Sequence, residues 1–253
     1  MRIYVINLDR SVERWRVINE QARQLGLQLT RVAAVDGSAK AKNGWVDFDT
    51  SGFRRNNGRD ALAGEYGCYM SHIAAVRQFI NDGGNSALIL EDDAILNSHL
   101  ADCLSAMRNQ FEPKSILIRL VVHRKIGFES LSTFEFSHNK TVNIGQCWLG
   151  PNGSAAAYWL TRDAALNLLK AALPAKMPFD TFIEHSWHFA TPSFITSPLV
   201  MQVPAPPFSE INASKDPLKP MKYPWYRRGG ALIFRSVLFF KRLFYCALHR
   251  RIA

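Results

Sequence analysis

The stretch Ala87-Leu88-Ile89-Leu90-Glu91-Asp92-Asp93 decides how we expect this chain to fold. Its four apolar residues predict a short buried strand. Three acids follow directly, at the carboxyl end of that strand, where open α/β sheets bind their ligands. Clustered carboxylates repel one another unless a cation or hydrogen-bond donors compensate. The acids therefore indicate a solvated strand end, a helix cap at Asp93, or a divalent cation that carries a phosphorylated substrate.

The sequence around this strand alternates between strand and helix patterns. Apolar residues recur at helical spacing between 11 and 25, ahead of Gly26, which suits a helix end. Residues 38–61 are polar and predict a long loop. The alternation predicts an α/β fold with a mostly parallel sheet flanked by helices. The expected strands are 3–8, 29–35, 87–90, 115–122 and 155–160, and the expected helices are 11–25, 64–81, 98–110 and 162–173, with 124–147 left unassigned.

The positive charge of the chain is concentrated near its end. With 47% hydrophobic and 21% charged residues, the 253-residue chain has the composition of a globular protein. Residues 1–216 hold 22 basic and 21 acidic residues, a net charge of about +1 out of the total of +10. We therefore expect no nucleic-acid partner, which would need a basic stripe on the body. Nine cations follow Asp216: Lys219, Lys222, Arg227, Arg228, Arg235, Lys241, Arg242, Arg250 and Arg251.

The spacing of the cysteines and the first residues of the chain indicate in which cellular compartment we expect the protein. The four cysteines are widely separated and include no C-x-x-C pair, so they suggest neither a zinc site nor a disulfide framework. They fit buried thiols in a reducing compartment. A strand pattern begins at Ile3 without a cationic leader, and no apolar run reaches the roughly 20 residues that span a bilayer. We expect a cytoplasmic protein, or one attached peripherally to the cytoplasmic face of a membrane.

The last part of the chain is expected to differ from the rest. We predict a main domain over 1–205 and, over 206–253, a proline-rich linker followed by a basic amphipathic helix. Four residues recur every seven positions and so share one helical face: Arg228, Arg235, Arg242 and His249. Bulky apolar residues cover much of the remainder. This profile is typical of a helix that lies in a membrane interface, with the cations of 228–251 toward anionic lipid. The alternative is a helix that packs in the core or in a dimer, since its many aromatic residues would also fill a groove.

Five sequence blocks occur in order along the chain. They are YVINLDR at 4–10, GEYGCYMSH at 64–72, LILEDD at 88–93, the segment 153–161, and PFD at 178–180. Together they resemble glycosyltransferase family 25, the bacterial lipooligosaccharide-type transferases related to collagen galactosyltransferases, over roughly residues 1–205. The resemblance implies a GT-A-like fold, a nucleotide-sugar donor and a divalent cation, Mn²⁺ or else Mg²⁺.

The resemblance also implies roles for the acidic triplet. In that class the acids behind the central strand replace the D-x-D metal signature, and here they read Glu-Asp-Asp. We expect Asp93 to be the direct metal ligand, because the last acid would point at the diphosphate. Asp92 or Glu91 would then reach the ribose or sugar hydroxyls of the donor. His188 is a candidate second metal ligand, although a lone histidine is more often structural.

Sugar transfer also requires a base that takes the proton of the acceptor hydroxyl. We favour Asp180 for this role, and Glu184 is the second candidate. A carboxylate is adequate if partial desolvation raises its pKa. The alternative is that Asp180 caps a helix that begins near Thr181.

Further residues are expected to contact the donor. Asn7, Arg10 and Arg14 follow the first strand, and an arginine can pair with diphosphate oxygens, or simply decorate an exposed helix. Glu65 and His72 are seven apart and share a helical face that is expected to face the donor sugar. The alternative is a capping role for Glu65 and a buried, hydrogen-bonded His72.

The sequence thus predicts an inverting, metal-dependent glycosyltransferase. We expect it to move a hexose, galactose from UDP-galactose, to a lipooligosaccharide-type glycolipid at the inner face of the cytoplasmic membrane. A UDP-glucose-dependent glucosyltransferase is the near alternative. A glycoside hydrolase would need two opposed carboxylates and no metal. A membrane-attached binding or scaffold protein, with structural acids, is the alternative outside enzymes.

Overall fold

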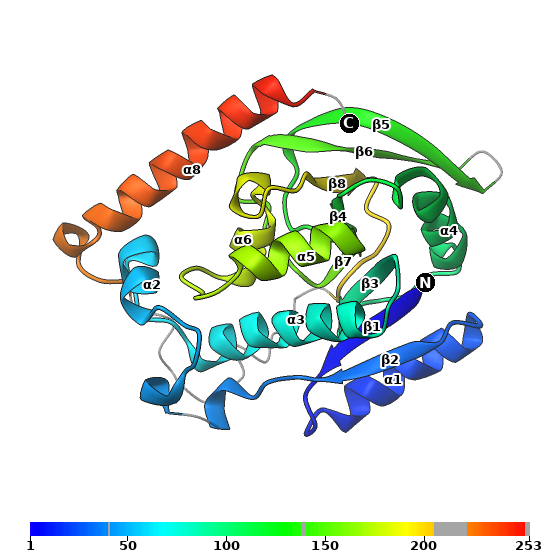
Figure 1. The fold of residues 1–253 in the computed structure, drawn as a ribbon, viewed down its shortest axis with the longest axis horizontal. Coiled ribbons are helices and arrows are strands. Elements are labelled where there is room, and N and C mark those ends of the chain that lie inside the picture. Colours follow the sequence, from blue (N-terminus) through cyan, green and yellow to red (C-terminus); the bar gives the residue numbers. More distant parts are fainter. Residues whose placement is uncertain (40, 138–139, 205–221, 251–253) are drawn as a thin grey trace.

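The computed structural model describes residues 1–39, 41–137, 140–204 and 222–250, which fold around one eight-stranded sheet (Figure 1). The strands lie in the order β2-β1-β3-β7-β4-β8-β6-β5. Their bounds are β1 (Arg2–Asn7), β2 (Leu29–Ala33), β3 (Ser86–Glu91), β4 (Leu117–Arg119), β5 (Ile126–Ser137), β6 (Lys140–Leu149), β7 (Ala157–Thr161) and β8 (Ser193–Ser197). The strand expected at 87–90 is therefore confirmed as β3, third in the sheet.

The strand directions correct one prediction. β1 runs parallel to β2 and β3, and β4 runs parallel to β8. The other pairs, β3–β7, β7–β4, β8–β6 and β6–β5, are antiparallel. Three of the seven pairs are thus parallel and four antiparallel, so the prediction of a mostly parallel sheet was wrong. The difference arises because β7 inserts antiparallel between β3 and β4, and because the unassigned stretch 124–147 forms most of a long hairpin, β5–β6.

Helices cover the sheet on both faces. All four expected helices are present, as α1 (Val12–Gln24), α3 (Ala63–Asn81), α4 (Leu100–Phe111) and α5 (Arg162–Ala171). The basic helix expected near the end of the chain is present too, as α8 (Gly229–Leu248), and the structure adds α2 (Thr50–Asn57) and α6 (Phe179–Ile183). Short 3₁₀ turns occur at Gly37–Ala39, Lys42–Gly44, Ser186–His188 and Trp225–Arg227.

The alternation of side chains along β3 builds both layers of the core. Leu88 and Leu90 belong to a cluster that includes residues of α1 and α4. Ala87 and Ile89, which point to the opposite face, belong to a cluster that includes residues of α3 and α5. A strand buried on both faces reads as a continuous apolar run, which is why this stretch was recognisable. The first polar residue after the run, Glu91, is the point at which the strand leaves the core.

Helix α2 lies inside the stretch 38–61 that we predicted to be a loop. Its start is fixed by Asp49, whose Oδ1 accepts a hydrogen bond from the Gly52 N–H at 2.7 Å. Its end is fixed by Gly58 in the left-handed conformation, with φ of 65°. Phe53 anchors the helix in a small aromatic cluster with Trp45 and Tyr66. The prediction of a loop was wrong here, because the polar composition of this stretch gave no sign of a two-turn helix with a cap at each end.

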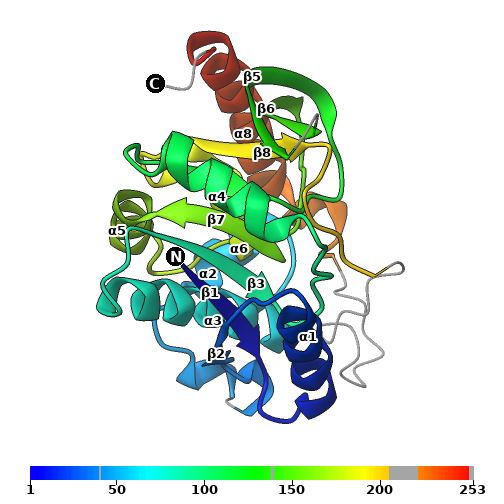
Figure 2. The same cartoon turned by 90° about the vertical axis from the view of Figure 1, so that its right-hand side faces the viewer.

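Helix α8 packs on the body at the opposite end of the molecule from α1 (Figures 1 and 2). It contacts α2 and β6, and its buried residues are Ala231, Arg242 and Cys246. The Gln146 side chain of β6 donates hydrogen bonds to the backbone oxygens of Cys246 (3.1 Å) and His249 (3.3 Å). The predicted boundary at 205/206 and the proline-rich linker lie largely outside the described residues, but α8 is bound to the first part of the chain.

The burial of Arg242 corrects the expected membrane face of this helix. Arg228, Arg235, Arg242 and His249 were predicted to form one cationic face toward lipid, but Arg242 is buried against the body whereas Arg235 is exposed. The side that faces solvent is largely apolar instead, with Ile233, Phe240 and Phe244 each about two-thirds exposed. Among the described residues, no helix is long and apolar enough to cross a membrane.

Candidate active site

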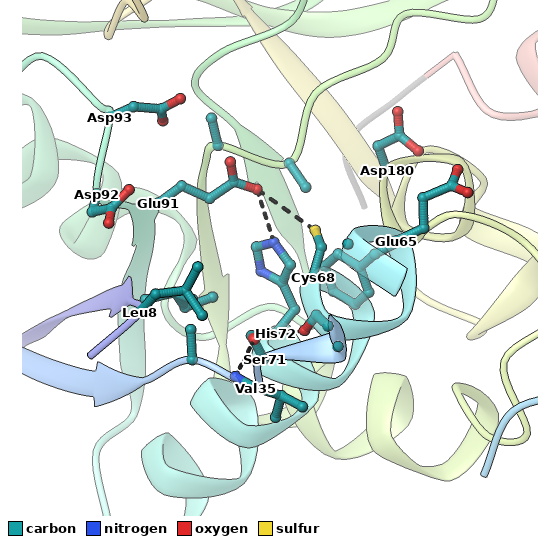
Figure 3. Close-up of a pocket in the computed structure, with 18 of the residues that line it drawn as sticks. Leu8, Val35, Glu65, Cys68, Ser71, His72, Glu91, Asp92, Asp93 and Asp180 are labelled. Atoms are coloured by element: carbon teal, nitrogen blue, oxygen red, sulfur yellow. Dashed lines mark hydrogen bonds and ion pairs between the residues drawn. The ribbon is translucent and has the colours of Figure 1, made fainter. Parts of the chain in front are cut away.

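The three acids at the end of β3 line a cleft of about 420 Å³. Its walls come from the ends of β1 and β3, the first turns of α3, the segment 154–156 and the start of α6. Figure 3 shows Glu91, Asp92 and Asp93 on one side of this cleft, and Asp180 and Glu65 on the other. The sequence blocks 64–72, 88–93, 153–161 and 178–180 thus all contribute residues to one cavity.

Helix α3 approaches the sheet closely because two glycines permit it. A Cβ at Gly67 would lie 2.5 Å from the backbone oxygen of Val35. One turn later, Ser71 Oγ accepts a hydrogen bond from the Val35 N–H at 2.8 Å (Figure 3). Gly37 is equally constrained, since a Cβ there would lie 1.8 Å from the Ala63 backbone oxygen. This contact sets the distance between α3 and the acids at the end of β3.

Asp92 is already held by the protein. Its Oδ2 accepts a hydrogen bond from Asn7 Nδ2 at 2.7 Å, and its Oδ1 lies 3.2 Å from Arg14 Nη1. Asn7 is itself buried and does not line the cleft, so its predicted contact with the donor is replaced by a contact with Asp92. Arg10 lines the cleft and pairs with Asp36. The arginines expected to face the donor are therefore at the cleft, each beside a carboxylate.

Asp93 differs from Asp92 in having an oxygen without a partner. Its Oδ1 is buried and makes no hydrogen bond. Burial, together with the neighbouring charges of Glu91 and Asp92, raises the pKa of Asp93 to about 7. A buried carboxylate oxygen without a donor is unusual in a folded protein. The carboxylate oxygens at the end of β3 suit a hard divalent cation. The residues present therefore fit the metal that the family resemblance implies.

Glu91, Cys68 and His72 form a second group in the cleft (Figure 3). His72 Nε2 lies 3.2 Å from Glu91 Oε1, and Cys68 Sγ lies 3.9 Å from the same oxygen. The other ring nitrogen of His72 lies 3.1 Å from the Tyr158 hydroxyl. Burial, with a smaller contribution from Glu91, raises the pKa of the Cys68 thiol. The expected alternative for His72, a buried and hydrogen-bonded side chain, is confirmed, although its ring also reaches the cleft.

Glu65 is held by the protein. Arg59 donates two hydrogen bonds to its carboxylate, at 2.7 and 2.5 Å. The carboxylate also accepts the Leu62 N–H at 2.9 Å, which completes a cap at the start of α3. The capping alternative for Glu65 is confirmed. Although Glu65 lines the cleft, Arg59 already compensates its charge.

Asp180 lies in the first turn of α6 and lines the cleft. The residue at the cap position is Pro178, so Asp180 is not the N-cap of this helix. One carboxylate oxygen accepts the Thr181 N–H at 2.6 Å. Burial raises the pKa of Asp180, and the Thr181 N–H opposes this shift. The expected raised pKa of a general base is thus present.

Glu184 and His188 do not line this cleft, which corrects both predictions. The Glu184 side chain is 1% exposed, pairs with Arg242 of α8, and has Arg119 Nη1 at 3.8 Å. Burial alone would raise its pKa, but Arg119 and Arg242 outweigh burial and bring the pKa of Glu184 down to about 2. Such a carboxylate is a poor base. Burial also lowers the pKa of His188 to about 4, and its ring stacks on Phe182.

Glu184 instead organises the backbone beside the cleft. Its carboxylate accepts the N–H groups of Asn152 and Gly153, at 3.0–3.1 Å. Arg242 Nη1 also donates to Asn152 Oδ1 at 3.1 Å. Ser154, which follows Gly153 in the sequence, has φ of 69° and lines the cleft. Helix α8 is therefore connected to the cleft through one buried ion pair.

The family comparison agrees with this arrangement. A sequence model of glycosyltransferase family 25 (LPS biosynthesis protein) matches residues 1–183. The chain belongs to glycosyltransferase family 25. No curated protein matches the sequence. The family 25 match ends one residue before Glu184, so Arg242 and the whole of α8 lie beyond it. Membership indicates a glycosyltransferase, which uses a sugar donor and an acceptor.

Three contributors to the site had no predicted role. Cys68 was within a quoted block but was taken for a buried thiol, and its position four residues before His72 on a helix was the missed signal. His123 lines the cleft from a segment to which no element was assigned. Arg59 lies in the predicted loop, where nothing in the sequence points to its pairing with Glu65.

Proposed function

We propose that this family 25 member is an inverting transferase that moves a hexose, galactose from UDP-galactose, onto a lipooligosaccharide-type glycolipid with the help of Mn²⁺ or Mg²⁺. The observation that supports this most is the buried Oδ1 of Asp93, a half-buried carboxylate at the cleft, because this oxygen makes no hydrogen bond and lies beside two further acids. Asp93 would hold the cation. When bound, such a cation neutralises the charge that develops on a leaving diphosphate.

The side chains of the cleft would perform the remaining steps. Asp92 contacts both Asn7 and Arg14. It thereby holds the Arg14 guanidinium at the cleft, where that group could pair with a bound diphosphate. Across the cleft, Asp180 would accept the proton of the acceptor hydroxyl as that oxygen attacks the anomeric carbon. The burial that raises the pKa of Asp180 makes it a stronger base than an exposed aspartate. A GT-A-like arrangement of the donor site is part of the same proposal.

A donor screen tests this function. The purified chain is incubated with UDP-galactose or UDP-glucose, Mn²⁺ and a glycolipid acceptor, and transfer is measured before and after chelation. We expect transfer from UDP-galactose that EDTA abolishes and added Mn²⁺ restores. Transfer from UDP-glucose alone would replace galactose in the proposal. Activity that survives chelation would contradict the metal-dependent mechanism and favour the hydrolase alternative.

We also propose that α8 attaches the protein peripherally to the inner face of the cytoplasmic membrane. Its solvent side carries Leu232, Ile233, Phe240, Phe244 and Leu248, each more than 60% exposed. Exposed cations surround this face, among them Arg235 and Lys241 on the helix itself. An apolar face bordered by cations suits the boundary between anionic headgroups and acyl chains.

Vesicle binding tests the attachment. Burial of one phenylalanine side chain contributes about 1.5–3 kcal/mol, so Phe244→Glu should lower binding to anionic vesicles by roughly tenfold or more. The control is Val46→Glu, which changes another exposed apolar side chain far from α8 in the sequence. Equal loss in both variants, or equal binding to neutral vesicles, would contradict this role of α8.

A further inference from the structure

A cysteine, a histidine and a glutamate meet in the cleft. Cys68 and His72 lie one turn apart on α3, and both face the end of β3, where Glu91 leaves the sheet (Figure 3). One ligand atom from each, Sγ, a ring nitrogen and a carboxylate oxygen, lie within 4.8 Å of one another. We propose that Cys68, His72 and Glu91 bind one Zn²⁺ ion, at a site distinct from the one assigned to Asp93.

The distances between the ligand atoms suit tetrahedral zinc. With bonds of about 2.3 Å to sulfur and about 2.0–2.1 Å to nitrogen and oxygen, tetrahedral Zn²⁺ holds its ligand atoms about 3.3–3.6 Å apart. The nitrogen–oxygen separation is 3.2 Å and the sulfur–oxygen separation is 3.9 Å. The sulfur–nitrogen separation is at most 4.8 Å, so the Cys68 and His72 side chains would move closer together when the metal binds.

The surroundings of His72 fix its ring for such a bond. The ring stacks on Phe179 with a centroid distance of 4.3 Å and an interplanar angle of 3°. Its Nδ1 lies 3.1 Å from the buried Tyr158 hydroxyl, which can accept a hydrogen bond from Nδ1–H and so leave the Nε2 lone pair to bind a metal. Metal-binding histidines in proteins are oriented by a hydrogen bond of this kind.

The chemistry of the ligands separates this site from the acids beyond it. A thiolate and an imidazole select zinc, whereas carboxylates alone suit Mg²⁺ or Mn²⁺. On binding, the thiol of Cys68 loses its proton to solvent and the sulfur–zinc bond forms without electron transfer. All three ligands line the cleft, so the fourth coordination position can face it. Three protein ligands with an open position are the arrangement of catalytic rather than structural zinc sites.

Metal titration tests this proposal independently of the transferase function. The full chain is freed of metal, and Co²⁺ is added as a spectroscopic substitute for Zn²⁺. In wild type, the Co²⁺ ion bound at this site should give a thiolate-to-cobalt charge-transfer band, and added Zn²⁺ should remove that band. Cys68→Ser should lose the band. Cys103→Ser, which changes a buried thiol of α4 in the other core layer, should keep it.

Asp93→Asn distinguishes the two sites, since it should keep the thiolate band. Absence of the band in wild type would overturn the proposal, and this outcome requires no variant to fold. Persistence of the band in Cys68→Ser, or its loss in Asp93→Asn, would overturn it as well, because the metal would then be bound by other residues.

Discussion

Asp93 and Glu184 are both largely buried carboxylates, yet the protein treats them in opposite ways. Glu184 has two arginines beside it and accepts two backbone N–H groups, and its pKa is lowered to about 2. Asp93 has an oxygen without a partner and two further acids beside it, and its pKa is raised to about 7. Where the fold supplies cations, the acid stabilises the structure. Where the neighbouring acids and burial outweigh the nearest arginine, Arg14, the acid is available to a ligand.

The largest effect expected from this comparison is on turnover. Asp180→Asn removes the proposed base and Asp93→Asn removes the proposed metal ligand, so each should lower kcat by roughly 10²–10⁴-fold. Both variants should remain folded, as judged by circular dichroism. The measurement is the initial rate of transfer under saturating donor and Mn²⁺. Turnover within a few-fold of wild type in either variant would remove that residue from the mechanism.

The next effect is on stability, at the Glu184 side of the comparison. Arg242→Gln leaves Glu184 buried with only Arg119 beside it, and breaking a buried pair in this way costs about 3–5 kcal/mol. The matched control is Arg235→Gln, one heptad earlier on the same helix but exposed, which should change stability by less than about 0.5 kcal/mol. Urea denaturation gives both values. Equal effects would mean that burial of Arg242 contributes nothing.

Substitution of Asp93 should raise the stability of the protein, whereas substitution of Arg242 lowers it. In metal-free buffer at pH 8, Asp93→Asn removes a desolvated negative charge that lies beside two further acids, so the melting temperature should rise by about 2–4 °C for each kcal/mol gained. Glu184→Gln, the equivalent change at the other site, should lower it. Calorimetry in EDTA measures both. A lower melting temperature for Asp93→Asn would show that the fold depends on this carboxylate.

The smallest effect concerns pH. Burial lowers the pKa of His185 to about 3 and that of His188 to about 4, so below pH 6.5 the unfolded chain binds more protons than the native state and stability falls as the pH falls. Asp93 acts oppositely, because its raised pKa makes the native state bind the extra proton between about pH 7 and 4. Without metal, stability should therefore fall more steeply from pH 7 to 5 in Asp93→Asn than in wild type. Parallel pH curves would contradict the raised pKa.

The sequence was sufficient for the elements whose signal is local. The apolar run predicted β3 with the acids at its carboxyl end, and helical spacing predicted α1. Strand direction was not predictable in this way, since nothing within 157–161 shows that β7 runs antiparallel to both of its neighbours.

Asp93 and Asp180, which each follow one strand or lie in one sequence block, line the cleft where the sequence led us to expect them. The site was not predicted where two distant segments decide the outcome. Glu184 and Arg242 are 58 residues apart, and only the packing of α8 on the body turns a candidate base into a structural ion pair. The same packing reversed the expected role of Arg242 in membrane binding.

The most direct test of the central claim, that the unpaired Oδ1 of Asp93 holds a cation for a nucleotide diphosphate, is calorimetric titration of UDP into the protein. We predict binding heat in the presence of Mn²⁺, little without it, and loss of the Mn²⁺-dependent part in Asp93→Asn. UDP binding of equal affinity with and without Mn²⁺, or Mn²⁺-dependent binding that persists in Asp93→Asn, would contradict the claim.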